Sequence, residues 1–297
     1  MPNEPSPAKT DLYGAISDAV FEVATFDFGN NVTLAPAKAY FMRPCLITST
    51  RPETSFPAMS VAAGGFGFDL VAELKVPSQF ELPNWFDQVN TIWWLAALMR
   101  LRGTPRLRAP IISNTSFANA LRSSSSSWPV ESESERTTLV LEPGAGESIA
   151  KTDLEWVGAH WVRAGNLMNK SSEFNLAFQA FDQSAFARDP TLALLLLWSA
   201  IEALFSPGYS ELRFRVSANI ATFIEAPGEG RALLHRRIVK LYDARSAAVH
   251  GRREVATQPL IETYALLKRA LIKIIDRNVV PSISDIESAL FGVASSP

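Results

Sequence analysis

The sequence has few of the residues that most often build metal sites and disulfides. It contains one cysteine, Cys45, and three histidines, His160, His235 and His250, in 297 residues. A single cysteine excludes an intrachain disulfide and a multi-cysteine zinc site. The histidines are too far apart in sequence to predict a metal site, and no HExxH, Walker or GxSxG motif is present. We therefore expect no metal and no cofactor.

Long apolar runs are also missing. The most apolar stretch, Thr191 to Phe205, is shorter than a bilayer requires and contains Glu202, so it predicts a buried core helix. The first ten residues have neither a basic region nor an apolar run, and no secretory signal is expected. A composition of 47% hydrophobic and 20% charged residues predicts a soluble globular protein, and the single cysteine suits the reducing cytoplasm.

The chain has almost no net charge, but its charges are unevenly placed. The formal net charge is −2, yet seven basic residues stand against one acid, Asp243, between residues 231 and 253. Such a run is most often a solvated helix face. The alternative is a footprint for phosphate groups. On that alternative the candidate phosphate contacts are Arg236, Arg237, Lys240, Arg252 and Arg253.

A serine-rich segment separates two parts of the chain that differ in their hydrophobic patterns. It is LRSSSSSWPVESESER, at residues 121–136. Before it, alternating and aromatic-rich patterns predict strands at 19–28, 38–49 and 66–76, and an amphipathic pattern predicts a helix at 84–101. We expect an N-terminal α+β domain over residues 1–120, with a sensor or regulatory role that the sequence does not define. A linker over residues 121–147 follows, with a candidate extra strand at 137–143.

From residue 148 the pattern changes to helices with short breaks between them. Start signals such as Asp189-Pro190 separate these helices. The segment therefore predicts an all-α domain over residues 148–280, and the tail at 281–297 has room for a short helix. The expected fold class is α+β, with a mixed N-terminal domain followed by a helical bundle. The predicted helices span 149–169, 172–187, 190–205, 210–224, 228–249 and 254–278.

The segment LYDARSAAVHG places Arg245 and His250 five positions apart, near the end of the fifth of these helices. At ~100° per residue the two side chains differ by roughly 140° around an unbroken helix, so they do not form an i, i+4 couple. The segment has a definite context. It follows WSAIEALF at 198–205 and SELRFRVSANIATFI at 210–224, in that order, and all three stretches are predicted to be helical.

At these residues the chain resembles the HEPN superfamily, specifically the ApeA-like HEPN domains of bacterial proteins tied to phage defence. The likeness covers residues 172–278. It rests on an LE-x-L pattern around Glu202, an SEL…R…A pattern at 210–218 and, most specifically, an LYD-x-RS-x-x-x-HG segment at 241–251. The resemblance implies an all-helical bundle in which Arg245 and His250 form the Rx4–6H motif of metal-independent HEPN ribonucleases.

The implied reaction is attack of a ribose 2′-hydroxyl on the adjacent phosphate. Histidine can transfer a proton in either direction near neutral pH, and the arginine fork can hold two phosphate oxygens. Because Arg245 and His250 diverge on one helix, a single subunit offers half a site, and we expect a homodimer. The expected function is an endoribonuclease acting on RNA as a toxin or antiphage, abortive-infection effector. Its expected partners include an antitoxin or a phage-derived trigger.

Four neighbouring residues are expected to support the motif. Tyr242 and Asp243 match the family segment, while Ser246 stands where many HEPN nucleases have Asn, Asp or His. Asp243 is expected to orient Arg245 or His250, or else to balance the charge of Lys240 or Arg236. Glu202 is costly to bury unpaired and is expected to meet one of three arginines. These are Arg245, Arg213 and Arg215.

Two other interpretations stay open. The first is a non-catalytic HEPN module that binds RNA, a nucleotide or a protein partner, since fold alone does not establish activity. The second is a helical scaffold in which Arg245 is a structural ion-pair residue and His250 caps a helix end. The other two histidines are expected to have structural surroundings, His160 as a satisfied core or interface residue and His235 as an exposed one.

Overall fold

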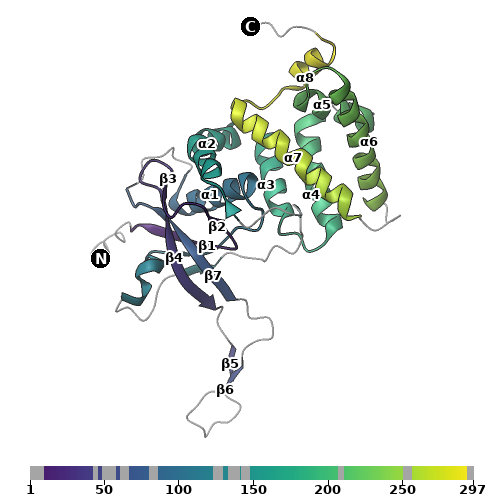
Figure 1. The fold of residues 1–297 in the computed structure, drawn as a ribbon. Coiled ribbons are helices and arrows are strands. Elements are labelled where there is room, and N and C mark those ends of the chain that lie inside the picture. The colour runs from purple at the N-terminus through teal and green to yellow at the C-terminus, as the bar shows by residue number, and fades with distance from the viewer. Residues whose placement is uncertain are drawn as a thin grey trace, which may run out of the picture. The chain divides into compact units, whose positions relative to one another are not determined.

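The computed structural model describes residues 10–42, 46–48, 58–60, 67–79, 86–122, 130–132, 141, 148–206, 211–249 and 256–292 of the chain. These residues divide into two compact units. The sheet unit comprises the described residues within 1–96, 107–134 and 147–151, and the helical unit those within 97–106, 135–146 and 152–297. The fold class is α+β, as predicted, with an antiparallel sheet and a helical C-terminal region (Figure 1).

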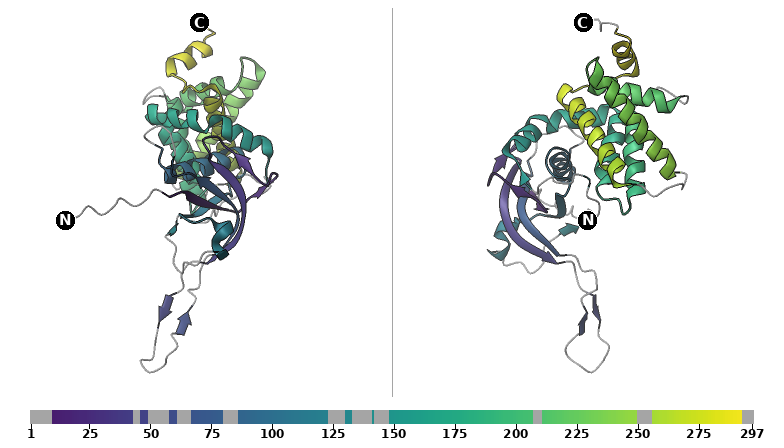
Figure 2. Two further views of the ribbon diagram at one scale, coloured as in Figure 1. Left: turned by 90° about the vertical axis from the view of Figure 1, so that its left-hand side faces the viewer. Right: turned by 45° about the vertical axis from the view of Figure 1, so that its right-hand side comes forward.

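A six-stranded antiparallel sheet with strand order β3-β4-β7-β1-β8-β9 forms the body of the sheet unit. Strand β10 pairs in parallel with β2, and β5 pairs with β6. Strands β4 and β7 have ten residues each and curve strongly along their length (Figure 2). The strands are β1 (Leu12–Ser17), β2 (Val20–Phe21), β3 (Phe26–Asp27), β4 (Thr33–Met42), β5 (Leu46–Thr48), β6 (Ala58–Ser60), β7 (Gly67–Val76), β8 (Arg108–Ser113), β9 (Val130–Ser132) and β10 (Ser148–Ile149).

The strand predictions are partly confirmed. The segment 66–76 contains β7, and 38–49 overlaps β4 and β5. The segment 19–28 holds two short strands, β2 and β3, because residues 22–24 are bent. Part of the predicted linker is structured, since residues 130–132 form β9 and residues 121–122 end the 3-10 helix η1 (Phe117–Arg122). The candidate strand at 137–143 lies outside the described residues except for Leu141, which is buried in a bend.

Helix α1 (Gln88–Arg102) confirms the helix predicted at 84–101. It approaches β1 closely at Gly14, where an added Cβ would lie 2.2 Å from Cγ2 of Ile92. The absence of a side chain at position 14 therefore allows this approach. The last turn of α1 belongs to the helical unit, where Arg100 donates two hydrogen bonds of 2.7 and 2.8 Å to the carboxylate of Asp182.

The helical unit follows the predicted pattern closely. Each predicted helix is present with its ends shifted by three residues or fewer, and the tail forms the short helix α8. The start predicted at Asp189-Pro190 is confirmed, because Asp189 Oδ1 accepts hydrogen bonds from the amides of Thr191 and Leu192. The helices are α2 (Lys151–Lys170), α3 (Ser172–Ser184), α4 (Pro190–Phe205), α5 (Leu212–Ile224), α6 (Glu229–Val249), α7 (Thr257–Arg277) and α8 (Ile283–Leu290).

Helix α4 is the core of the helical unit. It contacts α3, α5, α6 and α7, and α7 crosses α3 and α4 in Figure 1. Eight of its sixteen residues are buried apolar side chains, including Trp198, which is fully buried. This confirms the core helix predicted from the apolar run. Glu202 is the single ionisable residue of α4, so its surroundings determine whether this helix carries any polar function.

Candidate functional site

Helix α6 carries most of the residues predicted for the site. It runs from Glu229 to Val249, with Arg245 in its last turns. Residues 250–255 lie outside the described part of the chain. The predicted catalytic His250 and the predicted phosphate contacts Arg252 and Arg253 are therefore among the residues for which no geometry is described. The described part of the candidate site is centred on Arg245.

Arg245 is held between an acid and an aromatic ring. Its Nη2 lies 3.4 Å from Oε1 of Glu202 on α4, and both side chains are 25% exposed. Its guanidinium carbon lies 5.8 Å from the ring centre of Tyr242, one turn earlier on α6. The prediction that Glu202 meets an arginine is confirmed, and Arg245 is that arginine. A quarter-exposed guanidinium fixed on two sides can present its remaining edge to a phosphate.

Tyr242 connects Arg245 to the core. Its ring packs edge-on against Trp198 of α4, with ring centres 5.3 Å apart. Because Trp198 is fully buried, this contact fixes the Tyr242 ring on which Arg245 rests. The supporting role predicted for Tyr242 therefore has a geometric basis. Ser246, the next residue after Arg245, is partly exposed on α6.

Asp243 does not orient Arg245. Its carboxylate accepts two hydrogen bonds of 2.7 Å from Nε and Nη2 of Arg213 on α5. These hydrogen bonds hold the pKa of Asp243 below its usual value. No ion pair of Asp243 with Lys240 or Arg236 is found among the described residues, and the other predicted partner, His250, lies outside them.

The other two arginines considered for Glu202 are also engaged elsewhere. Arg213 is bound to Asp243, and Arg215 lies 3.1 Å from Glu287 on α8. The reason is positional, since both arginines lie on α5 and meet acids that approach from α6 and α8. Sequence reasoning missed the Arg213–Asp243 pair because the two residues are 30 positions apart and no local pattern links them.

The remaining basic residues of α6 differ in their availability. Arg236, Arg237 and Lys240 are all exposed. Arg237 forms a bidentate ion pair with Glu262 on α7, and this pair lowers the pKa of Glu262. Among the described residues, no carboxylate lies within ion-pair distance of Arg236 or Lys240. Arg236 and Lys240 can therefore bind a phosphate group without first breaking an ion pair.

The two described histidines have structural surroundings. His160 stacks on Trp156 at 4.6 Å, its Nδ1 lies 2.7 Å from the Trp156 carbonyl oxygen, and its Nε2 lies 3.3 Å from Asp276. The prediction of a satisfied histidine is confirmed. His235 is only partly exposed and packs edge-on against Phe214, so the prediction that it is exposed is wrong. The reason is that the start of α5 covers this side of α6.

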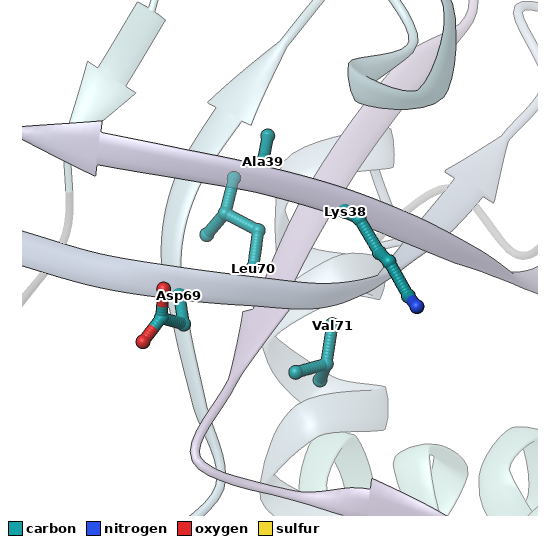
Figure 3. A pocket seen from close by; sticks show the side chains of 5 residues that line it. All are labelled: Lys38, Ala39, Asp69, Leu70 and Val71. Carbon is teal, nitrogen blue, oxygen red and sulfur yellow. The ribbon is translucent and has the colours of Figure 1, made fainter.

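No cluster of three or more His, Cys, Asp or Glu side chains suited to a metal ion is found in the described ranges. A hollow of about 480 Å³ lies on the sheet unit, between β4 and β7 (Figure 3). Its lining offers one cation and one carboxylate beside three apolar side chains, and it includes none of the predicted site residues. The lining residues are Lys38, Ala39, Asp69, Leu70 and Val71.

Comparisons with protein families, with curated proteins and with solved structures found no match to this chain. None of the helices in the described part of the chain combines the length and apolar content that a membrane crossing needs. The α+β fold and the cluster around Arg245 are therefore the observations on which a function is proposed.

Proposed function

We propose that this protein is a metal-independent endoribonuclease of the HEPN type. The observation that carries the proposal is the setting of Arg245. Its guanidinium is a quarter exposed near the end of α6, fixed by Glu202 and Tyr242 and followed by the Rx4H spacing in the sequence. An arginine fixed beside the surface in this way is suited to binding a phosphodiester and to stabilising the negative charge that builds during its cleavage.

In the proposed reaction the ribose 2′-oxygen attacks the adjacent phosphorus, and the bond to the 5′-oxygen breaks. Arg245 binds the non-bridging oxygens, and the imidazole of His250 transfers a proton. The products are a 2′,3′-cyclic phosphate and a 5′-hydroxyl. Arg236 and Lys240 are exposed on the same helix, but they lie roughly 180° and 140° around it from Arg245, so they are proposed to bind phosphates farther along the RNA.

The proposal also covers the oligomeric state of the protein and its role in the cell. The five-residue spacing of Arg245 and His250 corresponds to a divergence of roughly 140° on an unbroken helix, so the site is proposed to be completed by a second copy of the chain across a twofold axis. We place the protein in the cytoplasm, as a toxin or antiphage effector whose sheet unit senses a trigger or restrains the helical unit. An antitoxin or a phage-derived molecule is the proposed regulator.

One observation favours a different role. The ion pair between Arg245 and Glu202 is also what a helical scaffold or a non-catalytic binding module needs. Such a protein cleaves no RNA, and the effect of Arg245→Ala is a loss of stability alone. Thermal unfolding of Arg245→Ala beside its activity therefore separates the two roles.

The proposal is tested by expressing the chain in bacteria. We expect growth arrest with fragmented tRNA or ribosomal RNA, and we expect Arg245→Ala and His250→Ala to restore growth and intact RNA. The matched control is Arg269→Ala, which removes an arginine paired with Glu225 on the surface of α7 and should remain toxic. Arrest that persists with intact RNA, or that both substitutions leave unchanged, contradicts the proposal.

A further inference from the structure

Three buried polar atoms without a hydrogen-bond partner among the described residues belong to one cluster between α4 and α6. They are Nε1 of Trp198, Oε1 of Glu202 and Nε of Arg245. The cluster is continuous, since Glu202 pairs with Arg245, and Tyr242 contacts both Trp198 and Arg245. Buried polar atoms are almost always hydrogen-bonded in folded proteins, so three such atoms in one cluster require an explanation.

The chemistry of the three atoms restricts what they can bind. The indole and guanidinium N–H groups only donate, and the carboxylate oxygen only accepts. A phosphate oxygen would satisfy the two donors and repel Glu202, while an ammonium group would satisfy Glu202 alone. A hydroxyl group, whether of a ribose or of a water molecule, can do both, because it accepts from a donor and donates a proton to the carboxylate.

The contact between Glu202 and Arg245 fits this requirement. The 3.4 Å separation of Oε1 and Nη2 is within ion-pair range, but Oε1 and Nε make no hydrogen bond. No other described acid pairs with Arg245, since Asp243 faces Arg213. Glu202 is therefore the carboxylate that meets whatever binds beside this guanidinium.

We propose that Glu202 is a catalytic residue that accepts the proton of the attacking ribose 2′-hydroxyl. The inference rests on the proposed ribonuclease function and assigns one of its two proton transfers. The 2′-O–H bond breaks, its proton moves to the Glu202 carboxylate, and the 2′-oxygen forms a bond to phosphorus while Arg245 binds the phosphate. The 5′-oxygen leaves with a proton from His250, and exchange with water restores both groups.

This assignment divides the proton transfers between two residues. Glu202 acts as the base and His250 as the acid, so the two are distinguished by a leaving group that needs no acid. RNA with a sulfur atom in place of the 5′-bridging oxygen provides one, because a thiolate leaves without protonation. The assignment also predicts that the rise of the cleavage rate with pH on the acidic side depends on Glu202.

The test compares Glu202→Gln, Glu202→Asp and His250→Ala in the full-length protein on both RNAs across pH. We expect Glu202→Gln to lose about 10²–10⁴-fold in rate on both substrates, together with the acidic limb of the profile. Glu202→Asp keeps a carboxylate and should keep that limb at a reduced rate. His250→Ala should be slow on ordinary RNA and recover on the sulfur-containing substrate. Glu225→Gln, in the ion pair with Arg269, is the matched control for loss of a paired acid.

Several results would overturn the assignment. It is wrong if Glu202→Gln stays within a few-fold of the parent rate, which is the result expected when the cluster binds only a structural water. It is also wrong if the sulfur-containing substrate rescues Glu202→Gln, because Glu202 would then act on the leaving group. If the parent protein cleaves neither substrate, the proposed function fails and this inference fails with it. Should Glu202→Gln not fold, the pH profile of Glu202→Asp decides alone, since loss of its acidic limb contradicts the proposal.

Discussion

At the scale of single residues, acids determine which cations of the helical unit are available to a phosphate. Arg213 is bound to Asp243 and Arg237 to Glu262, so the positive charge of each guanidinium group is already balanced by a carboxylate. Arg236 and Lys240 have no such partner among the described residues. The proposed binding of RNA phosphates therefore depends on Arg245 and, on the other side of α6, on Arg236 and Lys240, more than on the full basic run.

The Arg213–Asp243 pair makes a pH-dependent contribution to stability. The pKa of Asp243 is lowered in the folded state, so its contribution is present above the unfolded value of about 3.9 and is lost as pH falls through the folded pKa. We expect Asp243→Asn to be slightly less stable than the parent protein at pH 7, because the pair is exposed. That difference should shrink progressively as the pH falls below the unfolded value of about 3.9 in denaturant unfolding experiments. A difference that stays constant as the pH is lowered into the acid range would show that Asp243 acts through packing.

The residues of the candidate site were predictable to different degrees. Glu202 could be assigned an arginine partner because a lone acid on an apolar helix requires one. The choice among Arg245, Arg213 and Arg215 could not be made, since it depends on the acids that α6 and α8 bring to the two arginines of α5. The sequence did not predict that the indole N–H of Trp198 would be buried without a hydrogen-bond partner, because a tryptophan in an apolar helix predicts only a core residue.

At the scale of elements, Gly14 determines how closely α1 packs on β1. Gly14→Ala places a Cβ 2.2 Å from Ile92, whose side chain is fully buried and cannot move away freely. We expect a loss of about 1–3 kcal/mol in the free energy of unfolding, measured with urea. The matched control is Gly230→Ala in α6, where no atom lies within 4 Å of the added Cβ.

The control should move in the opposite direction. Gly230 lies in the first turn of a helix, so alanine there is expected to gain about 0.4–1 kcal/mol by reducing the entropy of the unfolded chain. Equal effects of the two substitutions would mean that the contact between α1 and β1 does not constrain position 14.

The helices of this chain were more predictable than its strands. Helix α4 has a capping aspartate, a proline in its first turn and a continuous apolar run, and all three signals agree. Strand β1 has Gly14 and Ala15 at its centre, which gives it little strand character, yet it lies in the sheet between β7 and β8. Its pairing partners are distant in sequence, and only the folded sheet brings them together.

At the scale of the whole molecule, the proposed active site requires two copies of the chain. We expect sedimentation experiments to show a homodimer, and co-expressed subunits carrying Arg245→Ala and His250→Ala to regain part of the activity that each variant lacks alone. Recovery is expected because one site of the mixed dimer can combine an intact Arg245 with an intact His250. A monomer at all concentrations, or mixed dimers without activity, would show that no site is shared.

The central claim is that Arg245 and His250 cleave RNA without a metal, and RNA cleavage by the purified protein in EDTA tests it most directly. The account predicts 2′,3′-cyclic phosphate and 5′-hydroxyl ends. It also predicts at least ~10²-fold lower rates for Arg245→Ala and for His250→Ala, with Arg269→Ala close to the parent. Cleavage that stops in EDTA, or that continues at the parent rate in folded Arg245→Ala and His250→Ala proteins, would contradict it.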